Sequence, residues 1–281
     1  MHALLIPVVS AIIASFDPAI ISKFARSAPP LTFNAIRALI ATLLLGLFIV
    51  ISGNGIFFTA FWALLLIIAS GMLGPGIGGS AYIKAIQIMG GSLPVVITHT
   101  YIFVAQFLSA LLVGESLTLS GIIGGALAFT GILVALLKNG AKFNSKGVAL
   151  ASVAAFSWGT ATVIIKLVDM YTDIYTLALF RLFGVFLFTM PLGLLRGEKV
   201  VVNHDFIIAS AYGGILSWGI GMFLYVYAVH TLGVSATVII TAITPILSQA
   251  ANRFIAREKL SGRVLIGASL VALAIAIQVV H

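Results

Sequence analysis

The chain has 281 residues, of which 61% are hydrophobic and only 8% are charged, with a formal net charge of +8. A soluble protein carries about 25% charged residues, so this composition excludes a water-facing globular protein and predicts one membrane domain. The basic residues stand at the ends of apolar stretches, where anionic head groups favour them, so we expect no nucleic-acid partner. The absence of cysteine excludes disulfides, thiolate chemistry and cysteine-bound metals.

Ten apolar stretches are long enough to cross a membrane, since a helix needs about 20 residues to span ~30 Å of hydrocarbon. In chain order they cover roughly residues 3–25, 32–52, 57–89, 92–113, 118–137, 146–168, 174–195, 205–231, 234–255 and 262–280. The third is rich in glycine from Gly71 to Tyr82. We interpret this run as a site of close helix packing, with a gating hinge as the alternative.

The two halves of the chain repeat each other. The stretch from Tyr82 to Leu127 aligns without a gap with Tyr225 to Leu270, at a constant offset of 143 positions. Polar and glycine identities carry the alignment, namely Tyr82/Tyr225, Gly90/Gly233, Ser92/Ser235, Thr98/Thr241, Gln106/Gln249, Glu115/Glu258 and Gly124/Gly267. We therefore expect two units, residues 1–138 and 146–281, joined by a basic loop at 139–145.

Five spans in each unit is an odd number, so the second unit must enter the membrane from the opposite side. The sequence thus predicts an all-α membrane protein with ten transmembrane helices, arranged as two inverted five-helix repeats around a central cavity. In secondary transporters with such repeats, the substrate site lies near the midplane between them.

Lysine and arginine predict the orientation. The loops after the odd-numbered spans hold eleven of the 15 lysine and arginine residues, and the loops after the even-numbered spans hold essentially none. The basic residues of the odd-numbered loops are Lys23, Arg26, Lys84, Lys138, Lys142, Lys146, Arg196, Lys199, Arg257, Lys259 and Arg263. By the positive-inside rule, both termini lie outside the cytoplasm of a multi-pass plasma-membrane protein.

Several motifs resemble the EamA unit of the drug/metabolite transporter superfamily. They are SWGTATVIIK at 157–166, its weaker counterpart SFDPAIISK at 15–23, an arginine early in the next span (Arg37 and Arg181), and AVHTLGVSATVIITAITPILSQAANRFIAREKLSG at 228–262. The resemblance covers nearly the whole chain. It implies a ten-helix carrier with a midplane cavity for amino acids, sugars, nucleotide sugars, organic cations or drugs, and it implies cytoplasmic termini, against the charge count.

The halves differ at one place in these motifs. The first half has Phe16, Asp17 and Pro18 where the second has Trp158, Gly159 and Thr160. Asp17 is the only acidic residue well inside a predicted span, and such a residue is a candidate for function. It can couple transport to protons, or it can cap a broken helix that restarts at Pro18; both readings stay open.

Other polar residues inside the spans are candidates for substrate contact or coupling. His99 can change charge near neutral pH, although a packed histidine bonded to a carbonyl is the simpler interpretation. Gln106, Gln249 and Thr244 either contact substrate or join helices by hydrogen bonds, and we favour the second reading for the amides. Tyr101, Trp158, Tyr225 and Tyr227 are candidates for the cavity wall, although aromatic residues also form belts at the membrane interface.

Two further groups have simpler explanations. Arg37, Lys166 and Arg181 can bind an anionic substrate, but we interpret them as side chains that snorkel to head groups. Glu115 and Glu258 precede the last span of each half, and we expect each to cap the helix that follows it.

The leading hypothesis is a secondary transporter, an exporter of small amino-acid-like or amphipathic metabolites, with protons as a candidate coupling ion. A lipid-carrier flippase of similar architecture is the alternative. An intramembrane enzyme is disfavoured, because paired intramembrane carboxylates and metal-ligand spacings are absent. We therefore expect no catalytic residues, metal or cofactor, and the sequence does not predict the oligomeric state.

Overall fold

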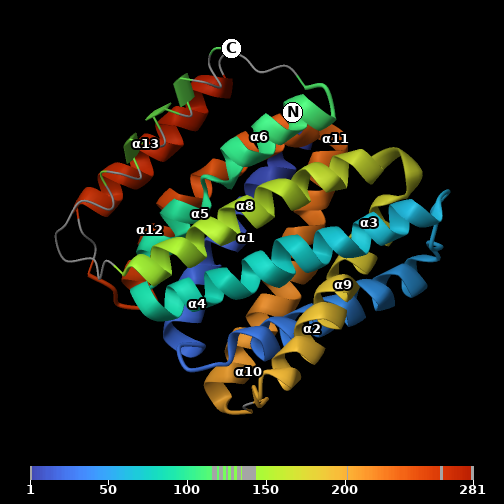
Figure 1. Cartoon of the computed structure of the whole chain (residues 1–281), viewed down its shortest axis with the longest axis horizontal. Helices are drawn as coiled ribbons and strands as arrows, with labels where there is room; N and C mark the ends of the chain where they lie inside the picture. Colours follow the sequence, from blue (N-terminus) through green and yellow to red (C-terminus); the bar gives the residue numbers. More distant parts are fainter. Residues whose placement is uncertain are drawn as a thin grey trace.

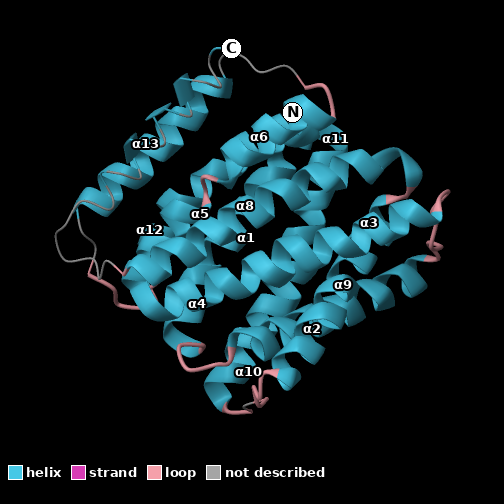
Figure 2. Ribbon diagram, viewed as in Figure 1, coloured by secondary structure: helices cyan, strands magenta, loops and turns pink. Residues whose placement is uncertain are grey.

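The computed structural model describes residues 2–115, scattered residues between 116 and 143, and then 144–200, 202–259 and 262–279. Over these residues the regular structure is helical (Figure 2). The chain is built this way because a lipid-facing backbone must satisfy its own polar groups, which a helix does within one segment.

The described part of the first half contains four long apolar helical runs. They are α1 (His2–Phe24), α2 (Pro30–Ser52), a continuous run of α3 (Phe61–Gly71), the π-helical segment η1 (Met72–Gly78) and α4 (Gly79–Met89), and a run of α5 (Ser92–Thr98) and α6 (Tyr101–Leu112). These runs agree with the first four predicted spans. The span expected at 118–137 falls largely outside the described residues.

The second half follows the same order. It contains α8 (Ser145–Val168), the short 3-10 turn η2 (Asp169–Tyr171), α9 (Ile174–Leu195), α10 (His204–Ala211), the π-helical segment η3 (Tyr212–Met222), α11 (Phe223–Ile240), the 3-10 turn η4 (Thr241–Ile243), α12 (Thr244–Phe254) and α13 (Gly262–Val279). Seven helical runs of the described part are long and apolar enough to cross a membrane. One of them, His204–Phe254, has 51 residues and covers two predicted spans. The protein is therefore a multi-pass membrane protein whose described part is built of helices.

The two halves interlock. Helix α1 packs against η3, α11 and α12 of the second half, and α8 packs against η1, α4 and α6 of the first half. Helices α2 and α9 pair with each other, as Figure 1 shows in its lower part. Each half thus contributes its first helix to the other half, so neither half has a separate core.

The π-helical segment η1 accommodates Pro75, which has no N–H and would break an ordinary helix. Asn34 of α2 stabilises it, because its Nδ2 donates to the carbonyl oxygens of Pro75 and Gly76 at 2.7 and 3.3 Å. These hydrogen bonds fix α2 against the π-helical segment.

Glycines allow α3 and α9 to touch. A Cβ at Gly71 would lie 1.9 Å from the backbone oxygen of Arg181, and one at Gly184 would lie 2.6 Å from the backbone oxygen of Ile68. Any side chain at these positions would push the two helices apart. The structure therefore supports close packing as the role of the glycine-rich run, as at other membrane helix interfaces.

Gly90 and Gly233 break their helical runs in the same way, with φ of 84° at both. After each break, a carboxylate from the other half receives the freed N–H groups. Glu258 accepts from the N–H groups of Gly91 and Ser92 at 2.7 and 3.1 Å. Glu115 accepts from the N–H groups of Val234 and Ser235, both at 3.2 Å.

The expectation that each glutamate caps the next helix along the chain concerns residues 116–118 and 260–261, which lie outside the described residues; the structure shows in addition that each glutamate caps a helix of the opposite half. A glycine break exposes N–H groups that need an acceptor, and the loop that lies beside each break comes from the opposite half. Glu115 and Glu258 are thus exchanged between the halves, and they link them.

Candidate functional site

A cavity of about 170 Å³ lies between the two halves. Both halves supply its wall: the first half contributes α1, α2, η1, α4, α5 and α6, and the second half contributes α8, α9, η3, α11, η4 and α12. Its lining residues are Ser10, Ala11, Ala14, Asp17, Arg37, Pro75, Gly79, Tyr82, Val95, His99, Tyr101, Trp158, Thr162, Arg181, Ser217, Trp218, Gly221, Met222, Tyr225, Thr241 and Thr244.

Asp17 and Arg37 form an ion pair on this wall. Nη2 of Arg37 donates to both carboxylate oxygens of Asp17, at 2.7 and 2.8 Å. The guanidinium also lies against the rings of Trp218 and Phe33, 4.7 and 5.4 Å from their centroids. The charge of Arg37 is therefore balanced by a carboxylate and by two aromatic faces.

The helix-cap reading of Asp17 was wrong. Helix α1 runs unbroken from His2 to Phe24 with Pro18 inside it, and the carboxylate of Asp17 faces Arg37 rather than backbone N–H groups. Neighbouring elements hold α1 at this level, since the Tyr212 hydroxyl donates to the Ile13 oxygen at 2.5 Å.

Arg181 is the second cation on the wall, and only 3% of its surface is exposed. Its Nε donates to Ser70 Oγ at 2.9 Å, and its Nη1 lies 2.9 Å from the sulfur of Met222. Arg37 is equally buried, at 2%. The interpretation that both arginines snorkel to head groups was therefore wrong, because glycines let the opposite half enclose them; a Cβ at Gly213 would lie 2.1 Å from Arg37 Nε.

Lys166 belongs to a different environment. It is partly exposed and pairs with Asp169 at 2.9 Å, one turn further along the chain. It does not reach the cavity wall. Of the three basic residues considered from the sequence, two line the cavity and one does not.

Aromatic rings form much of the remaining wall. Trp158 packs edge-on against Tyr82 and Tyr101, with ring centroids 5.0 and 6.1 Å apart. His99 lies edge-on to Tyr101 at 5.8 Å. Rings packed in this way make a firm apolar surface with hydroxyl groups at its edges.

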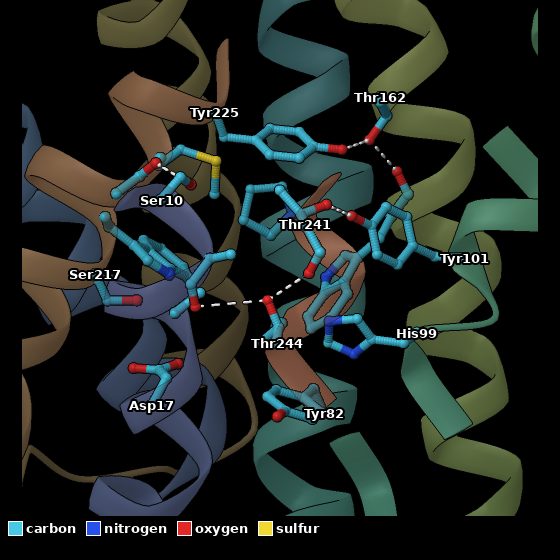
Figure 3. Close-up of a pocket in the computed structure, with 18 of the residues that line it drawn as sticks. Ser10, Asp17, Tyr82, His99, Tyr101, Thr162, Ser217, Tyr225, Thr241 and Thr244 are labelled. Carbon is cyan, nitrogen blue, oxygen red and sulfur yellow. Dashed lines mark hydrogen bonds between the residues drawn. The ribbon is translucent and has the colours of Figure 1, made fainter. Parts of the chain in front are cut away.

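Hydroxyl groups on the cavity wall form hydrogen bonds with one another, and the one between Tyr101 and Thr241 joins the two halves (Figure 3). The Tyr225 hydroxyl lies 3.1 Å from Thr162 Oγ1, and the Tyr101 hydroxyl lies 3.1 Å from Thr241 Oγ1. Thr244 donates to the Thr241 oxygen at 2.6 Å. These groups already have partners within the protein, so they offer a solute their remaining donor or acceptor capacity.

One ring nitrogen of His99 forms a hydrogen bond with the backbone of its own helix. Its Nδ1 lies 2.7 Å from the Val95 carbonyl oxygen, which can only accept, so Nδ1 carries a proton. This is the packed arrangement that the sequence favoured. The ring still lines the cavity, and its Nε2 has no hydrogen-bond partner among the described residues.

Six of the nine candidates taken from the sequence lie on the cavity wall, namely Asp17, His99, Tyr101, Trp158, Tyr225 and Thr244. Gln249 does not, and its Nε2 donates instead to the Ser92 oxygen at 3.0 Å, joining α12 to α5. Gln106 and Tyr227 are partly buried outside the wall. Over the described residues, no group of three or more His, Asp or Glu side chains is arranged to hold a metal.

Sequence reasoning passed over several wall residues. Ser10 donates to the Gly221 oxygen at 2.8 Å, and Ser217 belongs to η3. Small hydroxyl residues inside apolar helices are common, and nothing local marks these two. Thr162 had a usable signal, because it lies one helical turn after Trp158 and so shares its face.

The comparisons with known proteins agree with this architecture. One solved structure, described only as a crystal structure of a protein, superposes with a TM-score of 0.76 at 18% identity, covering 99% of this chain and 96% of that chain. At this identity the likeness concerns the fold alone. No curated protein matches the chain. The family model described as EamA-like transporter family matches residues 1–137 and 145–280. The chain therefore belongs to the EamA-like transporter family, within the drug/metabolite transporter superfamily.

Proposed function

We propose that the protein is a secondary active transporter that exports small metabolites, such as amino acids or amphipathic compounds, rather than an enzyme. The observation that carries this proposal is a solute-sized cavity with charged residues on its wall, which lies between two halves of a membrane protein. Charged groups are expensive inside a membrane and are kept where they serve a substrate or ion path.

We further propose that the halves are inverted five-helix repeats and that ten helices cross the membrane. Support comes from the reciprocal contacts: Gly90 and Gly233 break their helices alike, and Glu258 and Glu115 cap the opposite half alike. The two π-helical segments, η1 and η3, also occupy corresponding places. Two inverted units around one cavity can alternate access by exchanging conformations.

The test is transport by purified protein in lipid vesicles. A thermal-shift screen of metabolites in detergent first identifies a solute that stabilises the protein, and vesicles loaded with that solute then measure its efflux. Efflux that requires the protein and responds to an imposed pH gradient is expected. Movement of lipid-linked head groups alone would favour a flippase instead, and chemical conversion of the solute would favour an enzyme.

Orientation needs a separate measurement. The distribution of basic residues supports termini outside the cytoplasm of the plasma membrane. A reporter fused after His281 that is active only outside the cytoplasm is therefore expected to give a signal. A signal from a cytoplasm-dependent reporter at the same position would contradict this orientation.

A further inference from the structure

The charged groups on the cavity wall do not balance. Of the lining residues, Arg37 and Arg181 are cations and Asp17 is the only acid. Asp17 is held by Arg37 through both of its oxygens. One buried positive charge, that of Arg181, is left over.

Arg181 has only weak, neutral partners. Its Nε donates to a hydroxyl, its Nη1 faces the thioether of Met222, and it forms no ion pair with any residue the structure describes. A thioether is a poor acceptor and carries no charge. Its Nη2 makes no hydrogen bond within the described part, and Gly74 leaves the room beside it, since a Cβ there would lie 3.2 Å from Nη2.

The sequence repeat explains why this cation lacks a partner. At the place of Asp17, the second half has Gly159 when the two motifs are aligned from their first residues, or Thr160 at the offset of 143 that relates the halves elsewhere; neither residue is acidic. The hydroxyl of Thr160 donates to the Phe156 oxygen of its own helix at 2.9 Å and does not line the cavity. The second half therefore has an arginine equivalent to Arg37 but no acidic residue at the place of Asp17. A buried arginine without a counter-charge lowers stability unless a ligand supplies the negative charge.

We propose that the substrate is a small organic acid whose carboxylate binds Arg181. A guanidinium matches a carboxylate with two parallel hydrogen bonds. Arg181 lines the cavity, and among the described residues the sulfur of Met222 is the one hydrogen-bond partner of its two terminal nitrogens. This assignment rests on the proposed transport function and narrows its substrate class. A solute with one net negative charge neutralises the site, whereas a zwitterion leaves the positive charge in place and a cation adds to it.

The other residues of the cavity wall indicate what kind of group the carboxylate is attached to. Trp158, Tyr101 and Tyr82 present ring edges and faces, which favour an apolar or aromatic body. The volume of about 170 Å³ is smaller than the roughly 300–1,000 Å³ of pockets for drug-sized ligands. A single ring or a short chain therefore fits.

The test uses three probes that share a phenyl ring on a two-carbon chain: 3-phenylpropanoate, phenylalanine and 2-phenylethylamine. Binding to detergent-purified full-length protein is measured by calorimetry. We expect 3-phenylpropanoate to bind most tightly and the amine most weakly. In Arg181→Gln, affinity for 3-phenylpropanoate should fall about tenfold or more, since a charged hydrogen bond contributes about 1.5–3 kcal/mol. Arg181→Lys keeps the positive charge but cannot form two parallel hydrogen bonds with a carboxylate. Its affinity for 3-phenylpropanoate should lie between those of wild type and Arg181→Gln.

Two controls separate binding from folding. Arg196→Gln removes a cation from the exposed end of the same helix and should leave the affinities unchanged. The ligand-free Arg181→Gln protein should melt no lower than wild type, because the variant removes an uncompensated buried charge. A large fall in melting temperature would mean that the cation has a protein partner and would overturn the proposal.

The remaining outcomes distinguish the two claims. Equal affinity of wild type and Arg181→Gln for 3-phenylpropanoate, tighter binding of the amine, or no binding of any probe overturns the carboxylate assignment. Efflux of the amine that Arg181→Gln leaves unchanged also overturns it, while transport itself stands. Binding of 3-phenylpropanoate through Arg181 without its movement across vesicles overturns the transport function and leaves the assignment standing.

Discussion

Asp17→Asn is expected to destabilise the protein by about 3–5 kcal/mol, the usual effect of removing one partner from a buried ion pair. The reason is that Arg37, 2% exposed, would keep its charge and lose the carboxylate that binds it at 2.7 and 2.8 Å. Thermal unfolding in detergent measures the change. The same variant is expected to lose pH-driven efflux, because an amide at position 17 cannot bind and release a proton.

A double variant separates these two effects. Asp17→Asn with Arg37→Gln leaves no charge unpaired at this place, so most of the stability should return. If Asp17 couples transport to protons, pH-driven efflux stays absent in the double variant while efflux down a solute gradient recovers. Recovery of pH-driven efflux would show that the carboxylate only balances Arg37. Unchanged flux and an unchanged pH profile in Asp17→Asn alone would also exclude the coupling role.

Much of the helical framework could be predicted, because apolar length is a local property of the chain. The runs from His2 to Leu112 and from Ser145 to Leu195 agree with the spans expected from hydropathy. The matched glycines Gly90 and Gly233 also behave alike, as the repeat implies. The partners of Glu115 and Glu258 could not be predicted, since a repeat identifies equivalent residues and does not say that the halves exchange them.

The cavity wall was harder to predict, because it depends on which face of each helix turns inward. Tyr225 lines the cavity and Tyr227 does not, since two residues apart on a helix is roughly half a turn. The burial of Arg37 and Arg181 depends on glycines of other helices, Gly213 and Gly74, that leave space for guanidinium groups. From the sequence alone, an arginine in an apolar stretch is equally consistent with snorkelling.

The contacts that Glu115 and Glu258 make with the opposite half predict a second large effect, a loss of stability when either carboxylate is replaced by an amide. Glu258→Gln is expected to lower the free energy of unfolding by about 3 kcal/mol, since hydrogen bonds to a charged group contribute about 1.5–3 kcal/mol each. Its two oxygens accept from the N–H groups of Gly91 and Ser92 and from the hydroxyls of Ser92 and Ser22, at 2.6 to 3.1 Å. An amide offers one accepting oxygen, so one of the two N–H groups would face an NH₂ group instead.

Glu115→Gln is the matched variant, and its effect should be about half as large. Glu115 accepts from the N–H groups of Val234 and Ser235 at the longer distance of 3.2 Å, and from the Ser235 hydroxyl. It has no counterpart of the bond from Ser22, because Ile165 stands at the corresponding position. Denaturant unfolding of both variants, with hydrogen exchange at the starts of α5 and of the helical segment after Gly233, measures the difference. Equal losses would mean that the fourth donor contributes nothing, and no loss in either variant would mean that the exchanged carboxylates do not hold the two halves together.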